Sequence, residues 1–447
     1  MRYNYHKKRN FKDMAFLFKF IIALSILLVL SCTSQPPRYI NLMPTPEVYD
    51  ENNAPFTNDK LFRDAPYKGM LYATDRAPEL STNENTSATG FYTSERGHLL
   101  RLGVAKIEHG DGEFSWEEAR RISLAKNRTT DYPLSVTKTN ELGIYDGSYH
   151  PFLDKKQLAL ISEQPAKRFA ELINQKLAIS ENKDINIYVH GYKVNFDNAI
   201  LVSTELWHYL GYEGVFVAFS WPATPERLAY FADAETTISS AYIFRRFLRY
   251  LAQETNAENI NIVGYSQGTR LVADVLHNMA LKYHDETREQ TLKKLRIGQV
   301  ILIGSDIDKQ VMATYIVDGL LKIPKHLTLY VSEKDSALSL SQFFYRRSRL
   351  GQMFKAEEMS ASTLKFLTKT PELSVINVTD AEGATNENGH RYFRKSPWAS
   401  SDILMTLRHN LSPAERGLIR TEDNPVWSFP ADYISRLRKA IAKANPE

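Results

Sequence analysis

The hydrophobic positions in the central and C-terminal parts of the chain fall into short unbroken runs. These runs cover residues 185–189, 215–219, 260–263, 300–303 and 327–331, and stretches with helical spacing separate most of them. Strands that are apolar on both faces and alternate with helices form parallel sheets covered by helices on both sides. The pattern therefore predicts an α/β fold with a mostly parallel sheet, in which a ligand binds beyond the carboxyl ends of the strands.

A less regular pattern precedes this region. Residues 70–74 and 99–107 are predicted strands, and the stretch 83–89 between them is polar and turn-like. Residues 115–125 and 164–178 have the apolar spacing of helices. We expect these elements to join the core in one domain over residues 66–440, since α/β enzymes of this size often form a single enlarged domain.

The first 31 residues have the pattern of a secretory signal. A basic head precedes an apolar run over residues 20–30, which is shorter than the ~20 residues that cross a bilayer. Ser31 and Cys32 follow in a sequence that resembles a bacterial lipobox, and Cys32 is the only cysteine of the chain. We predict a lipoprotein signal peptide over 1–31 and acylation of Cys32, which would hold the protein on a membrane of the cell envelope. The alternatives are an uncleaved anchor and a chance thiol.

Residues 32–65 are rich in Pro, Asn and Thr and show little apolar periodicity. This composition predicts a flexible tether between the membrane and the folded domain. Thr33 follows the cysteine, whereas an Asp at that position is associated with retention in the inner membrane. The outer membrane is therefore favoured.

Composition and motifs exclude several classes of function. A net charge of +4 over 447 residues, with basic residues spread among acidic ones, indicates no nucleic-acid partner. A single cysteine cannot form a disulfide within the chain. No His-Glu-x-x-His, paired Cys-x-x-Cys or glycine-rich phosphate loop is present, so no metal or cofactor is expected. The oligomeric state stays open.

The most informative chemical motif is Gly264-Tyr265-Ser266-Gln267-Gly268, which lies between the strand 260–263 and a helix-forming stretch at 271–280. In a nucleophile elbow of this kind, the serine has strained backbone geometry and its hydroxyl is exposed above the sheet. The same five residues can also form a plain tight turn. The strand before the motif and the helix after it favour Ser266 as a nucleophile.

Acyl transfer also needs two backbone N–H groups that face the developing oxyanion. Gln267 follows the serine directly, and Tyr192 lies in the loop after the strand 185–189. We predict these two residues as the oxyanion hole. His190 precedes the nucleophile in the chain, so we expect it to brace this loop through hydrogen bonds rather than to act as a base.

The serine needs a base, and the base needs an acid that fixes its tautomer, in the chain order Ser, Asp or Glu, His. Asp335 follows the strand 327–331 and is favoured as the acid. Its rivals, Asp306 and Asp308, lie in the loop one strand earlier.

Two histidines follow Asp335 in the sequence. His409 lies in the predicted helix 404–411, where a histidine is usually a surface residue without a catalytic role. His390 lies in a loop after the strand-like residues 373–378. We therefore predict His390 as the general base and acid.

These motifs together resemble a bacterial alpha/beta hydrolase family of undefined function within the esterase and lipase superfamily. The resemblance covers about residues 70–435 and rests on Tyr72-Ala73-Thr74-Asp75-Arg76, Glu95-Arg96-Gly97, Val189-His190-Gly191-Tyr192, Phe219-Ser220-Trp221-Pro222, the Ser266 elbow, Ser332-x-x-Asp335 and Gly389-His390-x-Tyr392-Phe393. It implies an alpha/beta-hydrolase fold with the triad Ser266, Asp335 and His390, without a known substrate. Lys193 stands where an Asn is common, and Gly264 and Gln267 replace a more usual His and Met.

The sequence thus predicts a serine hydrolase that cleaves carboxylic esters of small molecules or lipids in the cell envelope. A non-catalytic, lipid-anchored protein of the same fold is the alternative, since fold does not imply function. Residues 221–231 either form a wall of an acyl pocket or pack as an ordinary helix start. The aromatic and basic residues at 343–347 are expected on a solvated helix face, with contact to an anionic substrate or lipid as the alternative.

Overall fold

The computed structural model describes residues 38–56, 58–79, 91–110, 115–148, 153, 155–159, 161–226, 229–339, 349–352, 359–385 and 389–444. The predicted signal peptide, Cys32, the polar stretch 83–89 and the segment 343–347 lie outside these residues. Among the described helices, none has both the length and the apolar composition needed to span a bilayer.

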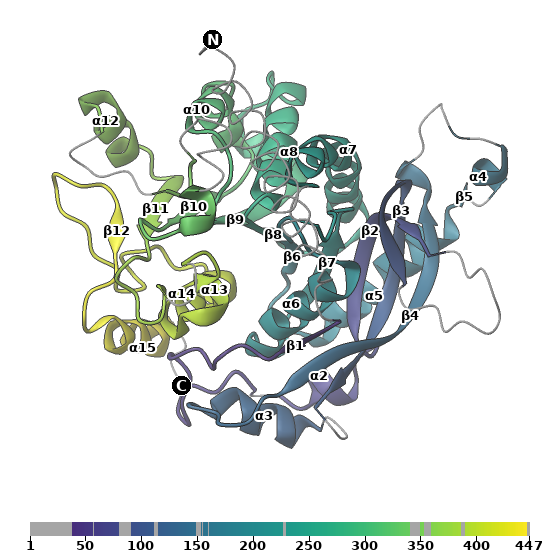
Figure 1. Ribbon diagram of the computed structural model, residues 1–447, viewed down its shortest axis with the longest axis horizontal. Helices are drawn as coiled ribbons and strands as arrows, with labels where there is room; N and C mark the ends of the chain where they lie inside the picture. The colour runs from purple at the N-terminus through teal and green to yellow at the C-terminus, as the bar shows by residue number, and fades with distance from the viewer. Residues whose placement is uncertain are drawn as a thin grey trace, which may run out of the picture.

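One mixed sheet of 12 strands runs through the described residues in the order β1-β4-β3-β2-β7-β6-β8-β9-β10-β11-β12, with β5 (Ile161–Ser162) beside β4 (Figure 1). The strands from β7 onward are parallel to their neighbours. They are β6 (Ile185–Val189), β7 (Val215–Ser220), β8 (Ile260–Tyr265), β9 (Ile297–Ile303), β10 (His326–Val331), β11 (Leu373–Asn377) and β12 (Trp427–Ser428). The prediction of a mostly parallel α/β sheet is confirmed, and its central strands are buried along almost their whole length.

The N-terminal part of the sheet is antiparallel. It consists of β1 (Tyr39–Asn41), β2 (Met70–Pro78), β3 (Tyr92–His109) and β4 (Pro133–Tyr145), and β2 joins it to the parallel part by pairing with β7. The predicted strands at 70–74 and 99–107 lie within β2 and β3. Sequence analysis missed β4, because most of its side chains are polar and partly exposed and it lacks an apolar run.

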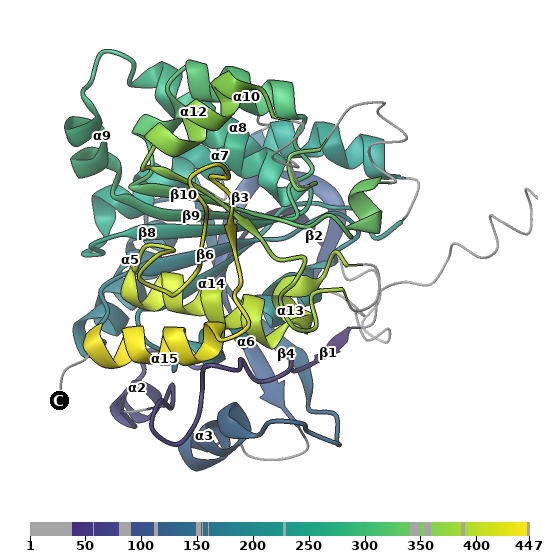
Figure 2. The same cartoon turned by 90° about the vertical axis from the view of Figure 1, so that its left-hand side faces the viewer.

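Helices cover both faces of the sheet (Figure 2). One face carries α7 (Tyr230–Glu254), α8 (Gly268–Lys282), α10 (Lys309–Val317) and α12 (Ala361–Lys369), and the other carries α6 (Phe196–Tyr209), α13 (Tyr392–Lys395), α14 (Pro397–His409) and α15 (Tyr433–Ala444). The remaining helices are α2 (Lys60–Arg63), α3 (Trp116–Leu124), α4 (Lys155–Ala159), α5 (Gln164–Ile179) and α9 (Arg288–Leu295). The structure therefore contains the predicted helices at 115–125 and 164–178, as α3 and α5.

The prediction of a flexible tether over 32–65 is wrong for the part that the structure describes. Strand β1 pairs with β4, and Met43, Val48, Tyr49 and Phe56 are buried in the main core. The backbone N–H of Met43 donates to the buried carboxylate of Glu205 at 3.1 Å. The apolar residues of this segment are spaced too irregularly to show a helical or strand period. Their side chains nevertheless pack against the core of the domain and become buried there. The folded unit therefore begins before the predicted boundary at residue 66.

Candidate active site

The strand, tight turn and helix expected around Ser266 are present at the carboxyl end of β8. Ser266 has a left-handed backbone conformation, with φ of 52°, between the end of β8 and the start of α8. Its N–H donates to the carbonyl oxygen of Ile303 on β9 at 2.9 Å. The turn needs glycine at position 268, where an added Cβ would lie 2.2 Å from the carbonyl oxygen of His190. A non-glycine residue with positive φ is strained, and such strain concentrates at functional sites.

A continuous chain of hydrogen bonds joins three residues that the sequence predicted together. The Nε2 atom of His390 lies 2.9 Å from Oγ of Ser266, and its Nδ1 atom lies 2.6 Å from Oδ2 of Asp335. All three side chains are buried, with Ser266 6% and His390 7% exposed. Both short contacts form when Nδ1 carries the imidazole proton and Nε2 accepts from the serine hydroxyl, which is the tautomer that a general base requires.

The loop of His390 packs closely against the rest of the site. The chain passes Asp335 at Gly389, where a Cβ would lie 2.4 Å from the carbonyl oxygen of Lys334. The ring of Tyr265 lies against the imidazole of His390 with 5.0 Å between the ring centroids. The other carboxylate oxygen of Asp335, Oδ1, accepts from the N–H of Leu338 at 3.0 Å. The imidazole and the carboxylate are therefore held by their surroundings as well as by each other.

The two predicted oxyanion residues both belong to segments that lie close to Ser266. Gln267 follows Ser266 in the chain and caps α8, and its side-chain amide donates to the carbonyl oxygen of Tyr230 at 2.9 Å. Tyr192 follows Gly191, where an added Cβ would lie 2.9 Å from Cβ of Ser266. The loop after β6 thus runs directly beside Ser266. The contribution of the two backbone N–H groups to catalysis stays a prediction.

His190 is separate from this hydrogen-bonded chain. Its Nδ1 atom lies 2.7 Å from the carbonyl oxygen of Gly191 and its Nε2 atom 3.1 Å from that of Trp221, on which the ring stacks. Burial, followed by the nearby charge of Arg76, lowers the pKa of His190 to about 3. A neutral imidazole has one N–H and therefore donates to only one of these two carbonyls, and a fully buried ring held in this way fits the predicted bracing role.

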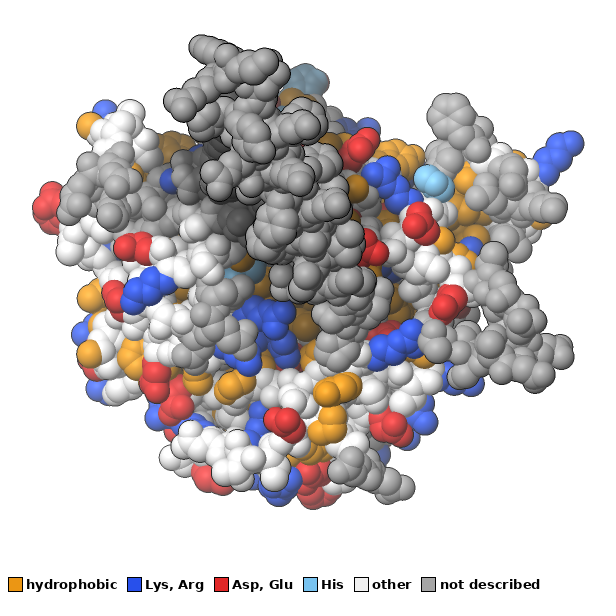
Figure 3. Space-filling view, viewed as in Figure 1, with side chains coloured by type: hydrophobic (Ala, Val, Ile, Leu, Met, Phe, Trp, Pro, Cys, Tyr) orange, Lys and Arg blue, Asp and Glu red, His pale blue; other side chains and the backbone are white. Residues whose placement is uncertain are grey.

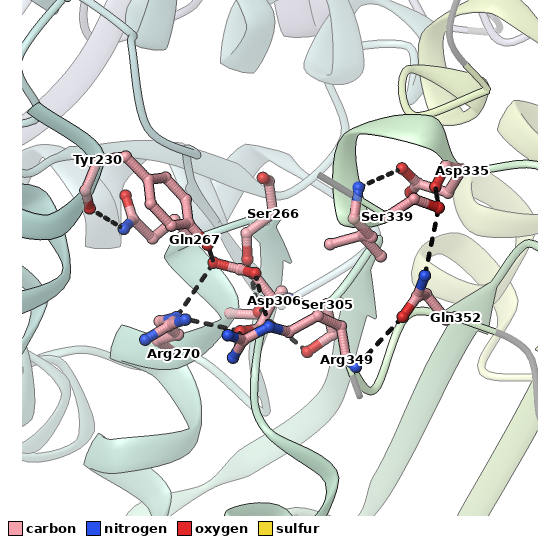
Figure 4. A network of polar contacts seen from close by, with 12 residues as sticks. Tyr230, Ser266, Gln267, Arg270, Ser305, Asp306, Asp335, Ser339, Arg349 and Gln352 are labelled. Atoms are coloured by element: carbon pink, nitrogen blue, oxygen red, sulfur yellow. Dashed lines mark hydrogen bonds and ion pairs between the residues drawn. The ribbon is translucent and has the colours of Figure 1, made fainter. Parts of the chain in front are cut away.

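Asp306, the first rival for the acid, contacts other groups. Its carboxylate accepts from Nε of Arg270 at 3.1 Å and from the hydroxyl of Tyr230, and it lies 3.6 Å from Nε of Arg349 (Figure 4). The backbone carbonyl of Asp306 also accepts from both arginines. This network braces the loop after β9 against α8 and the start of α7.

The other two alternatives also lie in structural positions. Asp308 is the N-cap of α10, where its carboxylate accepts from the N–H groups of Gln310 and Val311. His409 is the last residue of α14, and burial lowers its pKa to about 4. Of the acids and histidines weighed from the sequence, Asp335 and His390 are the pair whose hydrogen bonds reach Ser266.

Sequence analysis gave no role to Arg76. In the structure, its side chain lies between the loop after β6 and the loop after β7. Its buried guanidinium donates to Oγ of Ser220 at 2.9 Å and to the carbonyl oxygens of Val194 at 2.8 Å, Thr93 at 3.1 Å and Ala223 at 3.2 Å. One side chain therefore ties the loop after β6 to the loop after β7. The motif around Arg76 contributed to the family resemblance, but its partners are too distant in sequence to be inferred.

Of residues 221–231, the structure describes 221–226 and 229–231, and a role in an acyl pocket stays a prediction. Trp221 is fully buried and stacks on His190, which is ordinary core packing. At the start of α7, Tyr230 packs edge-on against Tyr192 with 5.2 Å between the ring centroids, and Phe231 is 53% exposed. The end of this segment therefore adjoins one predicted oxyanion residue.

Residues 166–408 match the model of a protein family described as alpha/beta hydrolase of unknown function (DUF900). The chain belongs to this family. The matched part contains Ser266, Asp335 and His390, and the family agrees with the resemblance seen in the sequence. The fold is thus that of an alpha/beta hydrolase.

Two solved structures are similar to this chain at low sequence identity. The structure of an esterase B from Lactobacillus rhamnosis, inhibited by a tributyrin phosphonate, is 14% identical, with coverage of 59% of this chain and 78% of that one and a TM-score of 0.28. A "putative cell surface hydrolase" from Lactobacillus plantarum is 11% identical, with coverage of 52% and 91% and a TM-score of 0.25. No curated protein matches the sequence.

Proposed function

We propose that the protein is a serine hydrolase that cleaves carboxylic esters through an acyl-enzyme intermediate. The observation that supports this most strongly is the hydrogen-bonded series from Asp335 through His390 to Ser266 at a strained strand-to-helix turn. Each member has the neighbour that its role requires: a base for the nucleophile and an acid that orients the base.

In the proposed mechanism, Oγ of Ser266 attacks the ester carbonyl as Nε2 of His390 takes the hydroxyl proton. The carboxylate of Asp335 stabilises the resulting imidazolium, and the N–H groups of Tyr192 and Gln267 stabilise the oxyanion. The tetrahedral intermediate collapses as His390 gives its proton to the leaving alcohol. Water then attacks the acyl-serine, again with His390 as base, and releases the carboxylic acid and the free serine.

We also propose that the protein acts in the cell envelope, anchored to the outer membrane by an acylated Cys32. The support is the basic head, the short apolar run and the single cysteine that follows it. The substrate class is an ester of a small molecule or a lipid.

Labelling with a fluorophosphonate probe and hydrolysis of p-nitrophenyl esters of increasing chain length test the chemistry. We expect the wild-type protein to be labelled and Ser266→Ala to lose both labelling and turnover. Ser203→Ala is the matched control, since the hydroxyl of Ser203 donates within α6, to the carbonyl of Ala199 at 2.9 Å. A folded wild-type protein that is neither labelled nor active would support the non-catalytic binding protein.

Fractionation of cells that express Cys32→Ala tests the anchor. We expect the wild-type protein in the membrane fraction with acyl groups on Cys32, as measured by mass spectrometry of its N-terminal peptide. A Cys32→Ala protein that remains uncleaved and membrane-bound to the same extent would show that lipidation is not the cause of attachment.

A further inference from the structure

A cationic cleft lies next to the candidate active site. It has a volume of about 670 Å³ and lies between the segment around β1, the residues that follow α3, and α13 with the start of α14. Its basic lining residues are Lys126, Arg128, Arg391, Arg394 and Lys395, and its acidic ones are Glu47 and Asp131. In Figure 3, Lys and Arg side chains gather in a hollow between α13 and β1.

Ion pairs within the protein neutralise only part of this charge. Lys126 pairs with Glu47 at 2.5 Å, and Arg394 pairs with the buried Glu205. Arg128 donates instead to backbone carbonyls, among them that of Leu42 at 2.9 Å, so no carboxylate among the described residues forms an ion pair with it. Arg391 is exposed. The charges of Arg128 and Arg391 together exceed that of Asp131, the lining carboxylate left after Glu47 is paired, so the cleft keeps a positive charge that a bound anion can compensate.

The position of Arg391 relates the cleft to the chemistry. Arg391 follows His390 directly, so its Cα lies about 3.8 Å from that of the candidate base. Burial raises the pKa of Tyr265, whose ring packs on the imidazole, and the nearby charge of Arg391 opposes that rise, so the guanidinium lies close to this ring. A ligand in the cleft would thus lie beside the loop that carries His390.

The N-terminal segment relates the cleft to a membrane. Tyr39, the first residue of β1, lines the cleft. Tyr39 lies seven positions after Cys32, and seven Cα–Cα steps span at most about 25 Å even when fully extended. If Cys32 is acylated, the bilayer surface must lie within that distance of the cleft. A long tether would have let any face of the domain meet the bilayer. Because the chain is folded from residue 39 onward, the short reach favours the end of the domain that carries the cleft.

We propose that the cleft binds the anionic headgroup of a phospholipid in the membrane that carries the lipid anchor. This inference rests on the proposed acylation of Cys32. The protein then docks with the end that carries His390 facing the bilayer, so that an ester substrate reaches Ser266 from the membrane side. Exposed lysines and arginines near an anionic leaflet each favour such docking by about fivefold in the equilibrium constant.

The test uses the full-length acylated protein in vesicles of phosphatidylcholine, with or without added phosphatidylglycerol. Acylation consumes the one native thiol, so an introduced cysteine takes a fluorophore at a single site. Thr130→Cys places the label at the exposed rim of the cleft. Lys293→Cys, on the exposed surface of α9, is the control, because α9 and β1 lie at opposite ends of the molecule (Figure 2). Quenching by lipids with a quencher in the headgroup reports how close each label lies to the bilayer.

We expect strong quenching at position 130 in vesicles with phosphatidylglycerol, weaker quenching in phosphatidylcholine alone, and background quenching at position 293. Arg391→Gln should lower the ratio of docked to undocked protein by about fivefold, and Lys282→Gln should leave it unchanged. Equal quenching at the two positions, no effect of phosphatidylglycerol, or no effect of Arg391→Gln would overturn the proposal. So would a wild-type protein without acyl groups on Cys32.

Hydrolysis of a water-soluble p-nitrophenyl ester separates this result from the proposed chemistry. Ser266→Ala should abolish hydrolysis and leave the quenching unchanged. Failure of the hydrolase proposal would appear as absent turnover with intact docking, whereas failure of the docking proposal would appear as normal turnover without selective quenching.

Discussion

Gly304 lies directly against the imidazole of His390, so close that a Cβ added to it would be 3.0 Å from Cε1 and 3.1 Å from Nδ1 of that ring. The same glycine, at the end of β9, has φ of +53° and donates its N–H to the hydroxyl of Tyr392 at 2.7 Å. Tyr392 in turn donates to the carbonyl oxygen of Tyr330 at 2.9 Å. Gly304 thus packs against the candidate base. Through Tyr392, it also joins the segment that follows His390 to β9 and β10.

Gly304→Ala should therefore lower kcat by roughly 10- to 100-fold, because the new methyl group displaces the imidazole from Ser266 and small misplacements of reacting groups are costly. The measurement is turnover of a p-nitrophenyl ester by a protein whose melting temperature is also recorded. Gly319→Ala is the matched control. It also has positive φ, at +94°, but its nearest neighbour is the flexible side chain of Lys322 at 3.4 Å. Equal kcat values for the two variants would show that Gly304 does not position the ring.

Asp335→Asn should lower kcat by about 10³- to 10⁴-fold with little loss of stability, since an amide holds the imidazole in the wrong tautomer. Asp306→Asn is the matched comparison. It weakens the network with Arg270 and Arg349, so we expect a loss of stability of about 3 kcal/mol and a smaller fall in kcat. Chemical denaturation and ester turnover measure the two effects. A larger kcat effect at Asp306 would contradict the assignment of the acid.

The parallel core and the hydrogen-bonded residues of the site could be predicted because each carries a local signal. Residues 185–189 are apolar on both faces, and β6 has the same bounds in the structure. Ser266 lies in a five-residue motif, and chain order then leaves few choices for Asp335 and His390. Contacts between residues distant in sequence carry no such signal. Arg76 and Ser220 are 144 positions apart, and nothing in either segment indicates that they bond.

In the N-terminal segment, the local composition pointed to the wrong structure. Its Pro and Asn content is typical of a tether, yet Val48 and Tyr49 are fully buried and the N–H of Val48 donates to Oγ of Ser401 at 3.0 Å. A segment that lies over an existing core needs only a few well-placed apolar residues and no regular period. Composition alone cannot distinguish it from a linker, because the surface that receives it comes from the other end of the chain.

Arg76→Lys should destabilise the protein by about 3 kcal/mol and lower kcat, although it keeps the charge. A lysine ammonium cannot reproduce the planar fork that bonds Ser220, Val194 and Ala223 together, so some buried carbonyls lose their partner. The kcat effect follows because Val194 lies in the loop that contains Tyr192. Arg63→Lys, at an exposed salt bridge with Asp59, should change neither quantity measurably. If Arg76→Lys kept the stability of the wild type but had a low kcat, Arg76 would act by positioning the loop that contains Tyr192 and not by stabilising the fold.

The stability of the protein should depend on pH partly through His190, because burial lowers its pKa to about 3 from an ordinary value of 6.5. Between these two values the unfolded chain binds a proton at this residue and the folded protein does not. Each unit of acidification in that window therefore costs about 1.4 kcal/mol of stability. The contribution is complete above pH 6.5 and is lost as the pH falls towards about 3.

His190→Gln removes the group that binds this proton in the unfolded chain. The glutamine side chain can still donate a hydrogen bond to a backbone carbonyl. The unfolding free energy of this variant should be lower than that of the wild type at pH 7, and the difference should shrink by about 1.4 kcal/mol for each unit of acidification below 6.5. Urea denaturation across this range gives both curves. Burial raises the pKa of Asp75, Asp197 and Asp233 to about 6, which has the opposite sign, but these groups are the same in both proteins and cancel in the comparison. Parallel curves would mean that His190 titrates alike in the folded and unfolded states, and a charged His190 would then have to be considered in the mechanism.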